Sequence, residues 1–470
     1  MIRCTLSLAL LAALTMPGAA RPAAAQQAER EPGTTGLTIY NDGRVLVRRA
    51  LPVSVARGRS DHRVTLGRLD PGSLVALDST VWIVGLRYDG AVDEESALRR
   101  SVGQRLVFLV QRPGSTPDTV SAVVLGTDPL RLGMAGGRVA YSMPGLPLYP
   151  ADVAAQGPSA TLSVESRAAR DSLRLGYFTS GATWYATYDA VLAGRNGRVT
   201  GKAVIDSRTL GATAATVQLV AGDVGRAMRE KAQYAPEMMV RAQAAADAGG
   251  TAEEQRVGEF HLYTLPGQVT LLPGQSTARA LFEPARVDWE RKYVLPGQLP
   301  YWGPLYQRGD EEKPPVEVRY IIERPREGDF GGRPIPAGVA RVYQPDSAGR
   351  LQLVGEASVT HTPAGQDLEL TAGTAFDVTA RRVQTSYDTQ QEPIGRGATR
   401  TIVTAEYEVT LTNATDSAVT VTVVEERGGD WEVTSSTVNS RRVSSTRAEF
   451  VVEVPAAGSK ALRYRIRATW

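Results

Sequence analysis

Cysteine is almost absent from this sequence, since its 470 residues contain one, Cys4. Cys4 lies before the first apolar run of the chain, Leu6 to Met16. The cysteine of a lipoprotein follows such a run, so Cys4 cannot become the lipid-modified first residue of a mature lipoprotein. No cysteine follows Cys4. A chain from which the first residues are cleaved can therefore form no disulfide and carries no thiolate nucleophile. We therefore expect burial of apolar surface, without covalent cross-links, to hold the exported chain folded.

The sequence also lacks an uncharged apolar run of the roughly 20 residues that a membrane-spanning helix needs. A shorter run, Leu6 to Met16, follows Arg3 and leads to the small residues Ala23-Ala24-Ala25. This arrangement is typical of a signal peptide with its cleavage site. We predict a signal peptide over residues 1–25, export to the periplasm or the external medium, and no membrane-spanning segment after cleavage.

Lysine is scarce, with five residues, and the formal net charge is only +3. The arginines are scattered singly or in pairs such as Arg48-Arg49 and Arg441-Arg442, with acidic residues nearby. A nucleic-acid-binding protein needs a basic stripe that displaces counterions from phosphates. We therefore expect no nucleic-acid partner.

Histidine is scarcer still, and His62, His261 and His361 lie too far apart to form a local metal-ligand pair. A metal site assembled from these distant histidines stays open as an alternative. The closest match to a nucleophile elbow, Gly274 to Ala278, lacks the second glycine, and no phosphate-binding loop occurs. We predict no cofactor, no metal and no catalytic residue.

Carboxylates are the catalytic groups that this sequence cannot exclude, because glycosidase acid pairs come from distant segments without fixed spacing. The candidates are Glu425, Glu426 and Asp430, which precede Trp431. A charged strand end and turn is the favoured interpretation. For Asp223, at a predicted strand end, a turn-stabilising role is likewise favoured over an acid or base.

What the sequence does contain is period-two alternation of β-branched residues, interrupted by Gly, Pro, Asn and Asp, which predicts a mainly β protein. Asn41-Asp42-Gly43 between two apolar runs predicts a hairpin. We expect tandem β domains with a small barrel-like segment, a C-terminal β-sandwich and a partly helical insertion. The predicted segments are a β module over 26–100, the barrel-like segment or compact sheet over 101–145, a central β domain over 160–345 with the insertion at 225–258, and the sandwich over 346–470.

The insertion holds Met228, Met238 and Met239, which are interpreted as part of a loose helix packed on its own sheet, with an adaptable binding surface as the alternative. At the other end of the chain, Leu462 to Trp470 alternates apolar residues with arginines. The pattern resembles the last strand of an outer-membrane barrel. Because the preceding strands are short and interrupted, a terminal sandwich strand is favoured.

Aromatic residues gather in a proline-marked segment between residues 296 and 315, at Tyr301, Trp302 and Tyr306. Rigid loop aromatics can bind sugars or protein partners, so these three residues are a possible binding surface. The alternative is that Trp302 fills the seam between two domains.

Several segments carry a resemblance to a known family. They are Leu173 to Tyr177, Gly181 to Tyr188, Leu219 to Asp223, Ile335 to Tyr343, Gly373 to Val378 and, at the N-terminus, Ile39 to Arg48. These segments resemble the mucoidy inhibitor A-like bacterial family, whose central region is a domain of unknown function. The resemblance implies an envelope location and an all-β build, but no catalytic residue. The coiled coil that such proteins often carry has no counterpart here, because residues 102–141 show no heptads.

Together these features predict an exported cell-envelope protein that acts as a non-catalytic binding or structural module, with an envelope protein or a glycan as partner. The alternative is a carbohydrate-active hydrolase with a carboxylate pair that sequence alone does not reveal.

Overall fold

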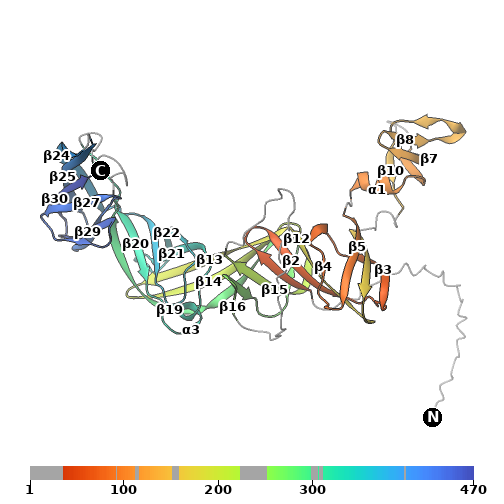
Figure 1. Ribbon diagram of the computed structural model, residues 1–470, viewed down its shortest axis with the longest axis horizontal. Coiled ribbons are helices and arrows are strands. Elements are labelled where there is room, and N and C mark those ends of the chain that lie inside the picture. Colours follow the sequence, from red (N-terminus) through yellow and green to blue (C-terminus); the bar gives the residue numbers. More distant parts are fainter. Residues whose placement is uncertain are drawn as a thin grey trace, which may run out of the picture.

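The computed structural model describes residues 35–90, 93–111, 116–150, 158–222, 251–297, 305, 311–395 and 398–469. The predicted mainly β fold is confirmed, since nearly all elements are strands and they form five sheets. Figure 1 shows the sheets following one another along the long axis of the molecule. Within the described ranges, no helix has the length and apolar character to cross a membrane. The predicted signal peptide and the methionine cluster lie outside the described residues.

The largest sheet of the N-terminal half has eight strands. They are β16 (Glu253–Val257), β17 (Phe260–Thr264), β15 (Ala212–Ala221), β1 (Gly36–Tyr40), β2 (Arg44–Leu51), β12 (Leu173–Ser180) and β4 (Val75–Ala76), with β18 (Val269–Leu271) beside β15. β1 and β2 form the hairpin predicted from Asn41-Asp42-Gly43. Gly43 has a φ of 87°, a conformation that glycine adopts without steric cost.

A three-stranded sheet packs beside it, in the order β3 (Gly58–Thr65), β11 (Ser159–Ser166) and β5 (Val81–Asp89). The two sheets change the predicted domain organisation. Strands from 26–100 pair with strands from 160–345, for example β2 with β12 and β3 with β11. One hydrophobic core therefore extends from Leu37 to Ala372. The separate N-terminal module that the sequence indicated is part of this continuous body.

The predicted barrel-like segment is an open sheet in the order β10 (Leu146–Leu148), β6 (Arg105–Val110), β7 (Asp118–Thr127), β8 (Leu130–Gly133) and β9 (Val139–Ala140). The compact-sheet interpretation is therefore correct, and the barrel is not. The sheet stays open because β10 and β9 do not pair with each other. Helix α1 (Glu94–Arg100) precedes it, and a small core around Phe108 belongs to this unit alone.

The central body also contains most of a ten-stranded sheet. Its strands are β22 (Leu351–Val359), β21 (Gly338–Pro345), β13 (Ala182–Ala193), β14 (Asn196–Ser207), β19 (Gln275–Leu295), β26 (Val419–Glu426), β29 (Arg447–Val454) and β28 (Ser440–Arg442), with β20 (Glu317–Ile322) paired to β19 and β23 (Leu368–Thr374) paired to β20. Helix α3 (Gly328–Gly332) lies against this body. The long strand β19 pairs with β14 in its first part and with β20 and β26 in its last, so it runs from one body into the next (Figure 1).

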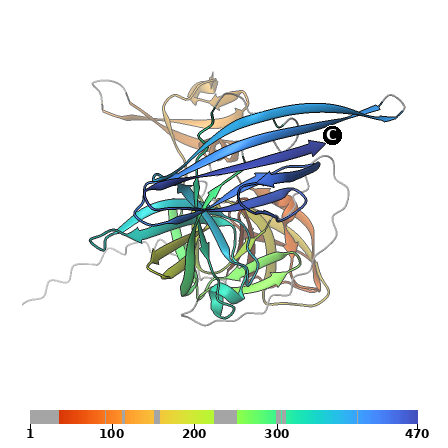
Figure 2. The same cartoon turned by 90° about the vertical axis from the view of Figure 1, so that its left-hand side faces the viewer.

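A β-sandwich at the C-terminus is confirmed. Strands β26, β29 and β28 face a four-stranded sheet of β24 (Val378–Gly395), β25 (Ala398–Asn413), β30 (Gly458–Thr469) and β27 (Asp430–Ser436). The predicted boundary at 346 is too early, because β22 pairs with β21 and β23 with β20 in the central body. In Figure 2, β24 and β25 extend beyond the rest of their sheet as a long hairpin.

The last strand is a sandwich strand, as the alternation favoured. Leu462, Tyr464, Ile466 and Ala468 are buried, and β30 lies between β25 and β27. Its arginines alternate outward, where Arg463 pairs with Glu408 and Arg465 pairs with Glu406.

The insertion at 225–258 ends in strand β16, which pairs with β17. The partly helical character expected for the insertion stays a prediction for the residues before this strand. The preceding residues of the insertion, up to 250, lie outside the described residues.

Candidate ligand-binding cavity

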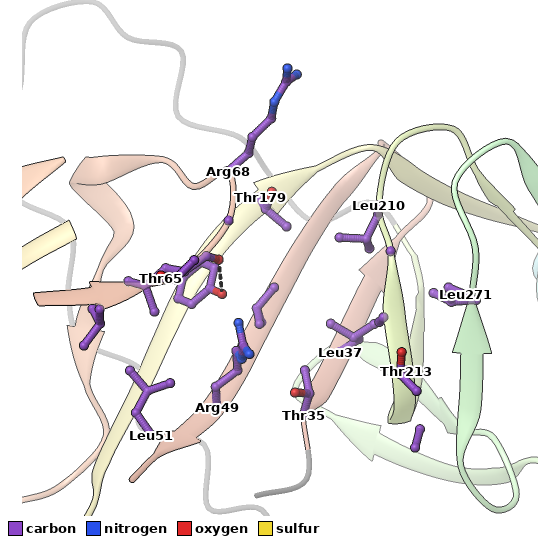
Figure 3. A pocket seen from close by; sticks show the side chains of 18 of the residues that line it. Thr35, Leu37, Arg49, Leu51, Thr65, Arg68, Thr179, Leu210, Thr213 and Leu271 are labelled. Atoms are coloured by element: carbon purple, nitrogen blue, oxygen red, sulfur yellow. Dashed lines mark hydrogen bonds between the residues drawn. The ribbon is translucent and has the colours of Figure 1, made fainter. Parts of the chain in front are cut away.

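A cavity of about 950 Å³ lies in the N-terminal half, over one face of the eight-stranded sheet. Figure 3 shows it between two walls, one containing Thr65 and the other containing Leu210 and Thr213. Ligand sites in proteins typically have volumes of about 300–1,000 Å³, with apolar linings and a few convergent polar groups. The volume of this cavity lies within that range, and its lining is divided about equally between apolar and polar surface.

The floor of the cavity is the inward face of β1, β2 and β12. Leu37 on β1 pairs with Val47 on β2, and Val47 pairs with Tyr177 on β12, so these side chains form one row across the sheet. Because side chains alternate between the two faces of a strand, Val47, Arg49 and Leu51 share the same face. Arg49 is thus a charged residue in an otherwise apolar row of β2.

The Arg49 side chain points into the cavity between Leu37 and Leu51 (Figure 3). Its Nε is buried and has no hydrogen-bond partner, and within the described ranges no carboxylate forms an ion pair with this guanidinium. Burial raises the pKa of the Tyr177 hydroxyl, and the positive charge of nearby Arg49 partly opposes that rise. Arg49 is half-buried and no carboxylate lines the cavity beside it, so its guanidinium is suited to bind an anionic acceptor.

The first wall is residues 209–214, and the turn at Gly181 holds it in place. The Gly181 carbonyl accepts hydrogen bonds from the amides of Arg208 and Thr209, at 2.8 and 3.1 Å. Gly181 has a φ of 108°, and a Cβ there would lie 2.3 Å from the Thr209 hydroxyl. Only glycine therefore fits this turn.

The rim of the same wall contains a backbone irregularity. β15 bulges between Ala212 and Ala215 where it pairs with β18. Ala214 within the bulge has a φ of 48°, and its amide donates to the Thr270 hydroxyl at 3.2 Å. Bulges and residues with positive φ are enriched at functional sites, where they redirect side chains.

The second wall is the end of β3 and the loop that follows it. The Tyr177 hydroxyl donates to the Leu66 carbonyl at 2.8 Å, which ties this loop to the floor. The Tyr88 hydroxyl donates to the Gly67 carbonyl at 2.9 Å and accepts from the Leu69 amide at 3.1 Å. These two tyrosines fix the loop, so the cavity is already formed without a ligand.

The charge of the cavity has one sign. The described residues that line it include Arg49, Arg63 and Arg68 but neither Asp nor Glu. Arg68 points away from the cavity at its rim (Figure 3), which leaves Arg49 as the cation at the floor. Hydroxyl groups from Thr35, Thr65, Thr179, Ser180, Thr209 and Thr213 add neutral donors and acceptors. The arrangement can bind an anionic group beside an apolar body.

The predicted binding surface of Tyr301, Trp302 and Tyr306 lies outside the described residues. Leu305, from the same segment, is buried in the C-terminal core, and its carbonyl accepts hydrogen bonds from Gln384 and Tyr407. The choice between a binding loop and a domain seam for Trp302 stays a prediction.

The three candidate carboxylates of the C-terminal region occupy different surroundings. Glu425 is buried and forms an ion pair with Arg382. Glu426 pairs with Arg447 on the surface, and Asp430 is exposed at the start of β27. Glu425 and Glu426 lie at the end of β26 and Asp430 lies at the start of β27, but the sequence did not indicate that Glu425 would be buried in an ion pair. Asp223 lies outside the described residues.

Two of the three distant histidines lie close together. The Nδ1 of His261 lies 2.7 Å from the carboxylate of Glu254. Burial lowers the pKa of His361, and nearby His261 lowers it further. Across the described part of the chain, no group of three or more His, Cys, Asp or Glu side chains is placed to hold a metal ion.

The cavity was not among the sites expected from the sequence. A signal was present in β2, where Arg49 interrupts the apolar alternation of Val45, Val47 and Leu51. Alternation does not reveal whether such an arginine faces a cavity, however, because one wall comes from residues 209–214, over 100 residues away.

The comparisons with known proteins add no relative, since no protein-family model matches this chain and no curated protein matches it.

Proposed function

We propose that this protein is an exported cell-envelope binding protein that holds a small amphiphilic ligand in the cavity over β1, β2 and β12, without catalysing a reaction. The observation that carries this proposal is the preformed cavity of about 950 Å³ with an apolar floor and a single cation, Arg49, at that floor. Its size suits a small molecule rather than a protein segment.

The location rests on the N-terminal sequence, in which an apolar run ends in Ala23-Ala24-Ala25. The resemblance to the mucoidy inhibitor A-like family is consistent with an envelope location. Mass spectrometry of the exported protein should place the mature N-terminus at or near Gln26, whereas an intact Met1 would contradict export.

Binding is tested with the neutral apolar fluorophore N-phenyl-1-naphthylamine, whose emission rises when it leaves water. The mature protein should bind it with a saturable signal. Thr179→Trp places an indole in the cavity and should weaken binding at least tenfold. The matched control is Thr389→Trp, on the exposed part of β24, which should bind like the wild type. Equal binding by all three proteins, or none by the wild type, would refute the proposed function.

A further inference from the structure

The class of ligand follows from the Arg49 guanidinium, which has no carboxylate partner, and from the side chains that surround it. Arg49 belongs to the inward, apolar row of β2, its Nε is buried without a partner, and no carboxylate lies in the cavity lining. Its neighbour Arg48, on the opposite face, donates to Thr38 and to Gln218. Both partners of Arg48 are neutral groups on β1 and β15, so within the described residues neither arginine pairs with a carboxylate, and Arg49 is the one of the two that faces the cavity.

An anionic group on the ligand would supply the missing charge. Arginine presents a planar fork of donors that matches the two oxygens of a carboxylate, and such charge-assisted pairs are stronger than neutral hydrogen bonds. A cationic ligand is disfavoured, because the described lining offers three arginines and no carboxylate.

The apolar surface extends from Arg49 in two directions. Leu37, Val47 and Leu51 form the floor, and Leu210 and Leu271 line the facing wall (Figure 3). These side chains are already buried apart from Leu210, which is half-buried. A linear hydrocarbon chain therefore gains affinity mainly by leaving water itself, by roughly fourfold for each methylene buried. With roughly 30 Å³ for each heavy atom, similar to the volume of a water molecule, a twelve-carbon chain with a carboxylate fills about 400 Å³ and fits the cavity.

We infer that the cavity binds an acyl chain with an anionic head, a long-chain carboxylate, whose head group pairs with Arg49 while its chain lies against the leucines and valine of the floor and wall. This inference rests on the proposed function and names its ligand class.

The test is displacement of the bound naphthylamine fluorophore by twelve-carbon probes, used below their micellar concentrations. Dodecanoate should bind at least tenfold more tightly than dodecanol, because a charge-assisted hydrogen bond is worth about 1.5–3 kcal/mol and 1.4 kcal/mol corresponds to tenfold. Dodecyltrimethylammonium should bind more weakly than dodecanol. Acetate, which lacks the chain, should not displace the fluorophore.

Three variants assign the effect to Arg49. Arg49→Met should abolish the preference for dodecanoate over dodecanol, and Arg49→Lys should keep part of it, because the charge stays but the fork is lost. The matched control is Arg44→Met on the same strand, since Arg44 pairs with Asp42 outside the cavity. It should keep the full preference. Circular dichroism checks that each variant is folded.

The outcomes separate this inference from the proposed function. If the fluorophore binds and Thr179→Trp blocks it, but dodecanoate binds no better than dodecanol, the carboxylate assignment is wrong while a binding function stands. Tenfold tighter binding of dodecyl phosphate than of dodecanoate would replace the carboxylate with a phosphate head. Retention of the preference by Arg49→Met would remove Arg49 from the site.

Discussion

Arg382 and Glu425 form an ion pair inside the C-terminal sandwich, with 3.0 Å between the guanidinium nitrogen and the carboxylate oxygen and with side-chain exposures of 2% and 4%. The Tyr464 hydroxyl donates to the same carboxylate, and the Arg382 guanidinium lies over the Tyr407 ring, 4.2 Å from its centroid. The pair joins β24 of one sheet to β26 of the other, so Glu425 has a structural role in this core.

Removing one member of this pair should destabilise the sandwich strongly. Arg382→Met leaves a buried carboxylate without its counter-charge, and such changes cost about 3–5 kcal/mol. Replacing both residues, with Arg382→Met and Glu425→Leu, should recover most of that loss, because neither member of the pair is then left buried without the other. Urea unfolding of the three proteins measures the effect. Equal stability of the single variant and the wild type would show that the pair is not formed.

Gly181 should control both the stability and the cavity. Gly181→Ala forces a Cβ against the Thr209 hydroxyl and leaves alanine at a φ of 108°. We expect a loss of about 1–3 kcal/mol and weaker binding of the naphthylamine fluorophore, because the wall at 209–214 must move. Gly43→Ala is the matched control, since its φ is also positive but nothing lies within 4 Å of the added Cβ. It should lose stability alone; unchanged binding in Gly181→Ala would contradict the role of this turn.

Alkaline pH should destabilise the protein through its buried tyrosines. Burial raises the pKa of each of the following hydroxyls: Tyr177, Tyr188, Tyr263, Tyr407 and Tyr464. In the unfolded chain they ionise near pH 10. Between that value and the higher folded pKa the native state binds more protons, so stability is complete below pH 10 and falls as the pH rises above it.

Two measurements check this behaviour. The melting temperature should fall steeply above pH 10, and the tyrosinate absorbance of the buried groups should appear only together with unfolding. Full tyrosine titration near pH 10 in a protein that keeps its native circular dichroism would contradict the burial of these hydroxyls.

Trypsin should cut first within residues 226–256, where the sequence has weak periodicity and offers Arg226, Arg229, Lys231 and Arg241. Arg256 should resist longer than these, because it lies in β16 and donates to the Gly258 carbonyl at 3.0 Å. Mass spectrometry of the early fragments identifies the sites. Early cuts at Arg381 in β24 or Arg441 in β28 would contradict the strand assignment there.

Most strands could be predicted from the sequence alone, because side-chain alternation and turn residues act locally. Asn41-Asp42-Gly43 specified the first hairpin, and the apolar row from Leu462 to Ala468 specified a terminal strand with one buried face. The mainly β class and the C-terminal sandwich followed from the same periodicity.

Only the tertiary structure decided which strands share a sheet. The pairing of β1 with β15 joins residues about 180 positions apart, and the pairing of β3 with β11 joins residues about 100 positions apart; a local pattern carries no information on such contacts. For this reason the sequence divided one continuous core into two domains and set the sandwich boundary too early. The cavity depends on the same contacts. Alternation places Arg49 on the inner face of β2. The cavity in front of Arg49 exists because the hydrogen bonds of Gly181 and of Tyr177 with Leu66 hold separate segments of the chain around that face.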